Sequence, residues 1–540
     1  MDFLGVGQDY SFDVIFSSGL SDGGEIIGKW ALPSPNQCRE HFKTQNDGSM
    51  PREPYQRCSQ AVFEAWLKPR IEKEPLIDSC FGLRFEKLTE SEVGVESLLE
   101  DATTGQKHIV RSQYVVGCDG AGSRVRKSIG GVLTGGPVPM AMFLVHFKSR
   151  DLSVLQRQGQ YWHIFFSNGG AIISQDEEDT WTVHMAIGLD VDAEKLDPEK
   201  VVAEALGGSA GPCPCKIDKV LVKSTWRPNI CIVDRYTSAG GRVFLTGDAA
   251  HQNIPTGGYG MNTAVGDSFD IGWKLAAVCH GFGGRTLLES YEHERRPVAV
   301  RNIERSGVHF SVHRQYIDWV SEAGHHAILA DTAQGRALRR KIDQFLSEHD
   351  GENKEHGIEL GYRNNHSPVV VPDTEVEEPE WSFRSYIPST WPGSRAPHVF
   401  LADGQTSIFD LFGPDFSIVD FSESGSIASA FGDVADALSL PLKKIHLPNE
   451  PHVRKVWERR AVLIRPDDHV AWRAPLEDNA VINPEEILRV AAGLGTPPIS
   501  RNPTWNGNSD SVETVLKRGF SGTVGNVDQN DVQALAAFQK

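Results

Sequence analysis

The sequence lacks three features that would place it in familiar classes of protein. Its eight cysteines form no CxxC pair and none follows Cys279, so neither a disulfide scaffold nor a clustered zinc site is expected. No run approaches the ~18 apolar residues of a membrane span, and the first residues, MDFLGVGQDYSFDV, do not resemble a signal peptide. Lys plus Arg number 54 against 72 for Asp plus Glu, which disfavours a binder of nucleic acid or anionic membrane. We therefore expect a reduced, cytoplasmic protein without either partner.

The length and composition instead suit several folded domains. The 540 residues are 39% hydrophobic and 23% charged, and should form roughly two to four domains. Strand-like runs rich in aromatic residues fill 140–190, helical periodicity prevails over 260–347, and Pro, Ser and Glu become frequent over 365–395. Alternating strand and helix patterns follow. These changes predict four segments: 1–130, 131–240, 241–375 and 376–540.

The most informative segment runs from a buried strand through a glycine-rich turn into a helix. Asp248 follows the strand, where a carboxylate can accept hydrogen bonds from sugar-like hydroxyls. Gly257, Gly258 and Gly260 let the backbone approach a flat or anionic ligand beside a helix N-terminus. In isolation, the same residues could simply cap a helix and form a turn. The helix repeats apolar and small residues on one predicted face: Met261, Ala264, Val265, Ser268, Phe269, Gly272, Leu275 and Ala276.

This segment resembles the second flavin motif of the class A FAD-dependent aromatic hydroxylases, the group of p-hydroxybenzoate and phenol hydroxylases. The similarity lies in GDAAHQNIPTGGYGMN, DSFDIGWKLA and SYEHERRP, which follow the family pattern in order. It implies that Asp248 binds the ribityl chain of FAD and that the backbone of 257–262 surrounds the pyrimidine end of the flavin. The FAD-binding residues implied here are Gly241, Arg242, Val243, Phe244, Leu245, Thr246, Gly247, Asp248, Ala249, Ala250, His251, Pro255, Gly257, Gly258, Gly260, Met261 and Asn262.

A second run, YVVGCDGAGSRVR (114–126), is similar to the DG motif of the same family. In that motif Asp119 and Gly120 would serve both FAD and NADPH. The residue types agree, because Asp119 and Gly120 form an acidic turn after a strand, while Ser123, Arg124 and Arg126 offer donors for a phosphate.

Two further similarities are less specific. The run RCSQ (57–60) resembles a helix start where the family places a Gln against FAD, so Gln60 is implied there; an exposed Gln at a helix start is the alternative. The runs at 357–373, 392–413 and 463–473 resemble the thioredoxin-like C-terminal domain of the phenol-hydroxylase branch. Because this region holds no cysteine, dithiol chemistry is excluded and an interface or stabilising lid is expected.

The sequence also departs from the family, whose first element is a strand, GxGxxG and helix that hold the FAD pyrophosphate. Gly5-Val6-Gly7 has no third glycine at the required spacing, and 120–125 fails the pattern at its sixth position. We therefore expect an N-terminally truncated chain that lacks a βαβ unit of about 30 residues and holds FAD loosely. The fold class expected is α/β: an incomplete FAD-binding Rossmann-like domain with an inserted antiparallel substrate sheet, followed by a thioredoxin-like domain.

The function implied is that of an FAD-dependent monooxygenase. It would use NADPH or NADH and O₂ to hydroxylate a small phenolic or other aromatic substrate, as a homodimer, in aromatic polyketide biosynthesis or phenol catabolism. Two alternatives stay open, namely a flavin-poor, non-catalytic dimeric scaffold and an FAD-dependent oxidase or epoxidase.

No catalytic base stands out. A base with a pKa near 7 would help to deprotonate a phenol, and the aromatic sheet offers His163 and His184, each of which could equally be an ordinary sheet residue. His251 is expected to be structural. The predicted aromatic lining of the substrate site is Tyr161, Trp162, Phe165, Phe166 and Trp181.

Overall fold

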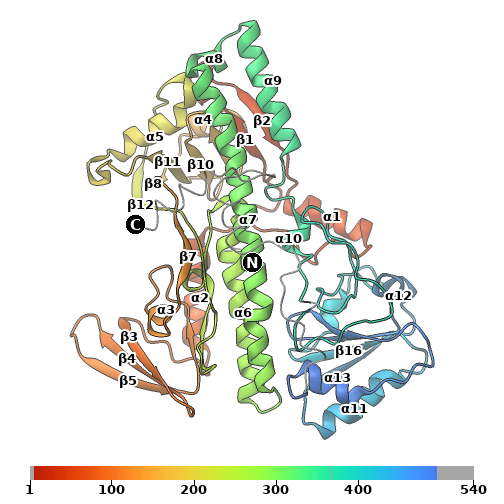
Figure 1. Ribbon diagram of the computed structural model, residues 1–540. Helices are drawn as coiled ribbons and strands as arrows, with labels where there is room; N and C mark the ends of the chain where they lie inside the picture. The colour runs from red at the N-terminus through yellow and green to blue at the C-terminus, as the bar shows by residue number, and fades with distance from the viewer. Residues whose placement is uncertain (1–4, 365, 496–540) are drawn as a thin grey trace, which may run out of the picture.

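Two long helices run through the middle of the molecule, and three groups of elements surround them (Figure 1). The computed structural model describes residues 5–364 and 366–495; the ends of the first and last predicted segments, 1–4 and 496–540, lie outside this range. The two helices are α6 (Tyr259–Cys279) and α7 (Arg285–Ala323). A large sheet lies at the top of the view, a C-terminal domain at the right and a small sheet at the lower left. This arrangement confirms the predicted α/β class.

The largest sheet joins strands from two distant parts of the chain, in the order β12-β8-β11-β10-β9-β1-β2. Neighbouring strands are antiparallel except β1 and β9, which run parallel with Val14 opposite His163. The sheet therefore departs from the purely antiparallel prediction and takes β1 and β2 from segment 1–130, because such long-range pairing leaves no periodic signal in the sequence. Its strands are β1 Val14–Ser17, β2 Ile26–Trp30, β8 Ala141–Lys148, β9 His163–Phe166, β10 Ala171–Ser174, β11 Thr180–Ile187 and β12 Lys219–Trp226.

Side chains alternate between the two faces of this sheet, and the faces have different neighbours. One face, with Phe166 and Trp181, is fully buried in a cluster that includes the apolar side of α5 (Pro198–Gly207). The opposite face packs its β1 end under α7 and α9 (Ala333–Glu348), where Phe16 and Tyr316 are buried together. Along β9, β10 and β11, the side chains on this second face are mostly half-buried.

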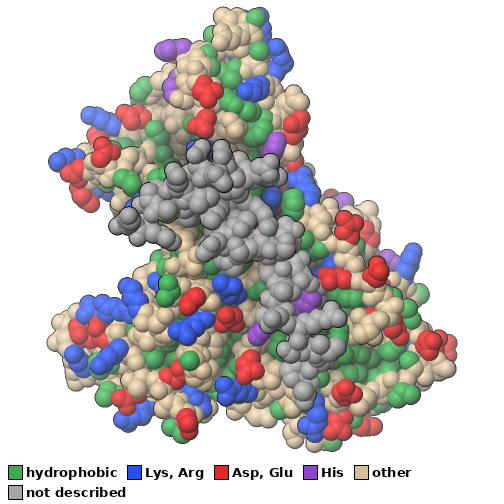
Figure 2. Space-filling view, viewed as in Figure 1, with side chains coloured by type: hydrophobic (Ala, Val, Ile, Leu, Met, Phe, Trp, Pro, Cys, Tyr) green, Lys and Arg blue, Asp and Glu red, His purple; other side chains and the backbone are tan. Residues whose placement is uncertain are grey.

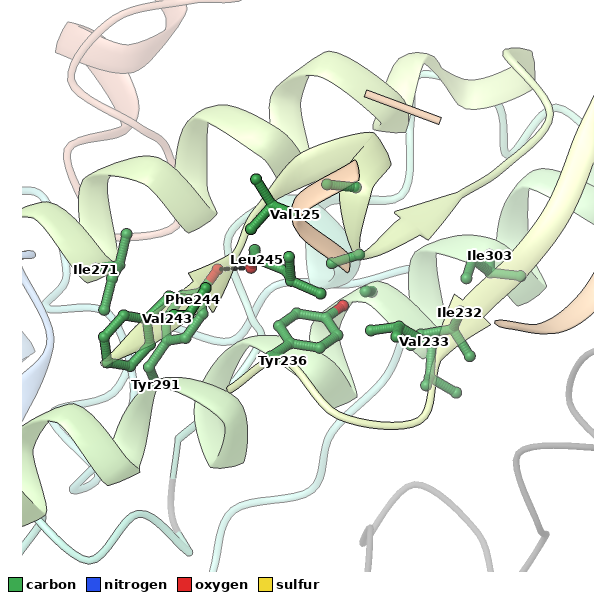
Figure 3. Close-up of a cluster of buried hydrophobic side chains, with 14 of the residues drawn as sticks. Val125, Ile232, Val233, Tyr236, Val243, Phe244, Leu245, Ile271, Tyr291 and Ile303 are labelled. Atoms are coloured by element: carbon green, nitrogen blue, oxygen red, sulfur yellow. Dashed lines mark hydrogen bonds between the residues drawn. The ribbon is translucent and has the colours of Figure 1, made fainter. Parts of the chain in front are cut away.

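A separate core surrounds strand β14 (Val243–Leu245), which pairs in parallel with β6 (Val115–Gly117). Beside it, β13 (Asn229–Val233) pairs with β7 (Leu133–Pro137) and β15 (His251–Gln252). Figure 3 shows the apolar side chains of β13 and β14 gathered with those of α6 and α7. The small outer sheet consists of β3 (Leu83–Glu90), β4 (Val95–Asp101) and β5 (Lys107–Ser112).

The C-terminal domain is a four-stranded sheet, β17-β16-β18-β19, with a parallel first pair and antiparallel others. Its core buries Ile418, Phe431 and Leu488. This mixed sheet with helices agrees with the thioredoxin-like architecture expected from the sequence. Its elements are β16 Phe416–Asp420, α11 Ser426–Ala437, β17 Leu442–His446, α12 Pro451–Trp457, β18 Ala461–Ile464, β19 Val470–Arg473 and α13 Pro484–Ala491.

Buried ion pairs tie this domain to the two central helices. Arg465, which follows β18, donates to both oxygens of Glu294 on α7 at 2.7 Å. Lys274 on α6 lies 2.7 Å from the same carboxylate. Although burial opposes ionisation of Glu294, Arg465 and Lys274 lower its pKa below the ordinary value. Buried ion pairs therefore connect the C-terminal domain to α7 directly, and to α6 through the shared carboxylate of Glu294.

Local sequence explains several helix boundaries. Ser34 and Gln37 form a capping box at the start of α1 (Pro35–Gln45), where Pro35 occupies the first turn. Asn483 caps α13 through the N–H of Glu486. The remaining α-helices are α2 Gln60–Lys73, α3 Arg124–Ser128, α4 Leu152–Leu155, α8 His325–Leu329 and α10 His356–Glu359.

The surface and helix lengths bear on possible partners. Within the described part of the chain, no helix combines the length and apolar character needed to cross a lipid bilayer. Figure 2 shows acidic and basic side chains intermixed on the viewed face rather than gathered into a basic patch.

Candidate active site

Strand β14 is held rigidly in the core and leads directly into the predicted flavin-binding turn. Val243, Phe244 and Leu245 are completely buried. The Tyr291 hydroxyl on α7 donates to the Leu245 carbonyl at 2.7 Å, which fixes the end of the strand (Figure 3). The residues that follow β14 therefore start from a defined position.

Asp248 emerges from this core into an exposed position. The chain turns at Gly247 with φ 54°, and a Cβ there would lie 2.9 Å from the Cβ of Ala264, so the turn requires glycine. The Asp248 carboxylate is exposed and accepts no hydrogen bond from any residue that the structure describes. An anionic acceptor at the end of a rigid strand is thus available to a ligand.

The glycine-rich turn leads into α6 without a side-chain cap. Gly257 and Gly258 have φ values of 83° and 68°, and Gly258 is the N-cap residue. A Cβ at Gly258 would meet no described atom within 4 Å, so the backbone there borders open space. The Gly257 N–H is already used, since it donates to Oε1 of Glu352 at 2.8 Å. The turn therefore presents open backbone next to a 21-residue helix.

The DG motif uses its polar groups within the fold. Asp119 accepts hydrogen bonds from Ser123 Oγ at 2.5 Å and from the backbone N–H groups of Arg124 and Val125, which caps α3. The Arg124 guanidinium lies 2.6 Å from Glu86. Ser123 and Arg124 thus have partners within the fold, and their role as donors to a phosphate stays a prediction.

Arg126 is likewise engaged, and it links the two predicted motifs. Its buried guanidinium donates to the carbonyl of Ala249 and to that of Ala121, each at 2.8 Å. A Cβ at Gly120 would meet no described atom within 4 Å, so the motif keeps an open backbone surface beside Asp248 and its neighbours. The DG turn and the second motif thus form one unit.

A buried carboxylate missed by the sequence analysis organises this unit. Asp267 on α6 accepts from His251 Nε2 at 2.7 Å, from Arg295 Nε at 2.9 Å and from the Gly247 N–H at 3.2 Å. Burial opposes ionisation of Asp267, yet Arg295 and His251 hold its pKa below the ordinary value. His251 therefore has a structural contact, and its predicted place among the FAD-binding residues stays a prediction. Asp267 and Arg295 both lie in the runs that resemble the family, DSFDIGWKLA and SYEHERRP, and this resemblance could have identified them from the sequence.

The orientation of α6 reverses the prediction made from its apolar residues. Met261, Val265 and Phe269 are more than half exposed, at 51%, 55% and 57%. The buried side instead contains charged residues such as Asp267 and Lys274. Periodicity failed because these charges are paired across the core, and a paired charge can be buried where an unpaired one cannot.

Glu352 connects the glycine-rich turn to the aromatic sheet. Besides the Gly257 N–H, it accepts from His313 Nε2 on α7 at 2.7 Å. Although burial opposes its ionisation, His313 and neighbouring donors lower the Glu352 pKa to about 2. The His313 ring packs against Phe165 on β9 with centroids 4.1 Å apart. The turn and the half-buried sheet face therefore share one network.

His163 and His184 both belong to this half-buried sheet face. Burial lowers the pKa of His163 to about 3 and that of His184 to about 4, so both rings are neutral near pH 7. Neither has the pKa near 7 that was sought in a base. Their roles in catalysis stay predictions.

The predicted aromatic lining divides between the two sheet faces. Trp162 and Phe165 are half-buried near His313, but Tyr161, Phe166 and Trp181 are completely buried in the opposite core. Strand alternation explains why Phe165 and Phe166 point to opposite faces of β9, whereas Tyr161 and Trp162 precede the strand and do not follow its alternation. Tyr161, Phe166 and Trp181 therefore do not line a substrate site.

Gln60 occupies the first position of α2 and is exposed. Its side-chain amide donates to Glu64 at 2.7 Å, an ordinary contact along a helix. Its predicted role towards FAD, like those of the other residues implied by the resemblance, stays a prediction.

Comparison with known proteins gives matches over most of the chain. Residues 26–306 match the family described as FAD binding domain, and residues 389–494 match that described as aromatic-ring hydroxylase, C-terminal. The FAD-dependent monooxygenase apdD of Emericella nidulans is 43% identical over 506 residues, which is 91% of this chain and 80% of that protein. The 2,4-dichlorophenol 6-monooxygenase of Cupriavidus pinatubonensis is 28% identical over 78% of this chain and 77% of its own.

Solved structures show the same likeness. The flavin-dependent monooxygenase PieE, in complex with FAD and substrate, has a TM-score of 0.75 at 26% identity, covering 90% of this chain and 88% of that one. RebC with bound 7-carboxy-K252c has a TM-score of 0.74 at 27% identity, covering 91% and 87%.

Proposed function

Because this chain belongs to the family of FAD-dependent aromatic-ring monooxygenases, we propose that it hydroxylates a phenolic ring with NADPH or NADH and O₂. The named relatives include enzymes for simple phenols, such as phenol 2-monooxygenase, and for polyketides, such as tetracenomycin A2 monooxygenase-dioxygenase. The relatives named for tetracenomycin and for polyketide hydroxylation support a tailoring step in aromatic polyketide biosynthesis, with phenol catabolism as the alternative.

The residues of the candidate site fit FAD. Asp248 offers a free carboxylate to the hydroxyls of a ribityl chain, and open backbone at Gly258 and Gly120 admits a ligand close to the main chain. When bound, FAD would pass electrons from the nicotinamide to O₂ and so supply the oxygen-transfer chemistry. The N–H of Gly257 would not take part directly, because Glu352 already accepts from it.

The chain's own residues would position the reactants and exclude water. Asp267 holds the turn at Gly247 through a buried network, and Glu352 holds the turn at Gly257. Across the sheet face, Phe165 supplies an apolar surface on which an arene can lie. The neutral His163 ring beside it can accept a hydrogen bond from a phenolic hydroxyl, which would raise the electron density of the ring.

The observation that carries the flavin assignment is the exposed, unpartnered carboxylate of Asp248 at the end of a rigid strand. Asp248→Asn should lower the FAD content of the purified protein, since a hydrogen bond to a charged acceptor contributes about 1.5–3 kcal/mol. Asp433→Asn, an exposed change on α11, is the matched control. Flavin content is measured from absorbance after denaturation, relative to protein. Equal flavin content in both variants would refute the role of Asp248.

The same proposal includes predictions about the oligomeric state and the cellular location of the protein. A homodimer in the cytoplasm is proposed from the family resemblance, and light scattering on the purified chain tests the dimer. Consumption of NADPH that depends on an added phenol would separate the hydroxylase from the oxidase alternative.

A further inference from the structure

Two half-buried histidines stand on one face of the seven-stranded sheet without hydrogen-bond partners. Neither the His163 nor the His184 imidazole bonds to any residue that the structure describes. Because both side chains are only half-buried, their ring nitrogens can exchange solvent for a bound ligand. Unused imidazole nitrogens on an apolar face are therefore available to a ligand.

The strand register sets the spacing of these two rings. His163 on β9 lies opposite Ile173 of β10, while His184 on β11 lies opposite Ala171 of the same strand. One strand separates β9 from β11, so the two backbone positions are about 10 Å apart across the sheet and about 7 Å apart along it, the distance from Ala171 to Ile173. A single six-membered ring is too short to contact both imidazoles at once.

The surface between the histidines is flat, apolar and uncharged. Phe165, Ala171 and Ile173 are half-buried there and lie between or beside the two rings. Phe165 is nearly parallel to His163, with centroids 5.5 Å apart and an interplanar angle of 8°. Trp226 closes the far side, 6.1 Å from His184 and at 83° to it.

The charged side chains nearest this face already have hydrogen-bonding partners. Arg57, near Trp162, pairs with Glu177 at 2.9 Å, and Lys148 on β8 pairs with Asp179 at 2.5 Å. Glu352, over the β1 end, is paired with His313. A carboxylated ligand would therefore bring an unpaired charge to this face, which carries a desolvation cost.

The face is also connected to the glycine-rich turn. Phe165 contacts the His313 ring, His313 donates to Glu352, and Glu352 accepts from the Gly257 N–H. A ring bound against Phe165 would therefore lie on the sheet face that is linked by these contacts to the predicted flavin site. It would not lie in the core on the opposite face.

We infer that the sheet face between His163 and His184 binds an uncharged aromatic substrate of at least two linked or fused rings, with a hydrogen-bonding group toward each histidine. This inference rests on the proposed function, because it names the substrate class of the same site. One ring would lie against Phe165, and the second would extend over Ala171 towards His184 and Trp226.

The test compares three probes on the full chain: phenol, 4-hydroxybiphenyl and 4′-hydroxybiphenyl-4-carboxylate. Binding is followed by quenching of tryptophan fluorescence and, separately, by change in the flavin absorbance spectrum. We expect 4-hydroxybiphenyl to bind about tenfold or more tightly than phenol, because the second ring buries more apolar surface. The carboxylated probe should bind more weakly than 4-hydroxybiphenyl. Because both rings are already neutral, the affinity should not change between pH 5.5 and 8.

The His184→Leu variant separates the two ends of the site. It should weaken 4-hydroxybiphenyl binding about fivefold while leaving phenol unchanged, whereas His326→Leu on exposed α8 should change neither. His184→Gln keeps a hydrogen-bonding group, should retain binding and serves if the leucine variant misfolds. Equal affinity for phenol and 4-hydroxybiphenyl, or tighter binding of the carboxylated probe, would overturn the inference.

The two readouts distinguish this inference from the proposed function. Selective tryptophan quenching without bound flavin would contradict the flavin enzyme but support the two-ring site. Flavin bound and phenol hydroxylated without preference for a second ring would support the enzyme and overturn the two-ring site.

Discussion

The Arg126 guanidinium donates a hydrogen bond to the carbonyl of Ala249 at 2.8 Å, across 123 positions of sequence. Its other terminal nitrogen donates to Ala121, next to the DG turn. One buried side chain therefore holds together the two runs that carry the flavin resemblance. This contact adds to the parallel pairing of β14 with β6 in setting the position of Asp248 relative to Gly120.

Arg126→Met should loosen both runs at once. The change leaves the buried Ala249 carbonyl without its donor, at a cost of about 1–3 kcal/mol, while the exposed Ala121 carbonyl can bond to solvent. We expect a lower free energy of unfolding in a denaturant titration together with a lower FAD content. Arg111→Met, an exposed residue of β5, is the control and should leave both quantities unchanged. An Arg126→Met protein with wild-type stability and flavin content would contradict this linking role.

Stability should decrease in acid because of Glu352. Its pKa is about 2 in the folded protein against an ordinary value of 4.5, so its ionised form stabilises the fold above about pH 4.5. That contribution is lost as the pH falls from 4.5 towards 2, and amounts to at most about 3 kcal/mol. Glu352→Gln should flatten this part of a curve of unfolding free energy against pH.

The histidines define a window that begins at higher pH and overlaps that of Glu352 below about pH 4.5. Because burial lowers the pKa values of His163 and His184 from 6.5, the unfolded chain takes up protons below pH 6.5 that the folded chain does not. Stability therefore also falls as the pH drops from 6.5, and His163→Gln should reduce the slope between pH 6.5 and 4.5, where Glu352 contributes little. An identical response to both substitutions would contradict the assignment.

The ion pairs of Arg465 should couple the C-terminal domain to α7. Arg465→Met would leave the buried Glu294 with one described charged partner, Lys274, and the Ser367 hydroxyl, and breaking a buried pair costs about 3–5 kcal/mol. We expect calorimetry to show the C-terminal domain unfolding at a lower temperature, as a separate transition. Arg460→Met is the control, since its partner Asp478 is exposed. A single transition at the wild-type temperature would show that apolar packing, not Arg465, joins the domains.

The sequence predicted the site best where the chain is contiguous. Asp248, Gly257 and Gly258 are close in sequence, so their chemistry could be recognised before their positions were known. The contrast is α6, where the run of apolar residues at helical spacing is exposed at Met261 and Phe269. Its buried charges could not be predicted from periodicity, because burial of Asp267 depends on Arg295, which comes from another helix.

The sequence by itself determined the family, the order of the domains and the two runs expected to hold FAD, because these depend on residue types at short spacing. Tertiary structure alone decided that β1 joins β9 in the large sheet and that His163 and His184 share a face. It also decided which aromatic side chains are core and which face the candidate site. These features arise from pairing between segments far apart in the chain, where strand register and packing, not local composition, select the partner.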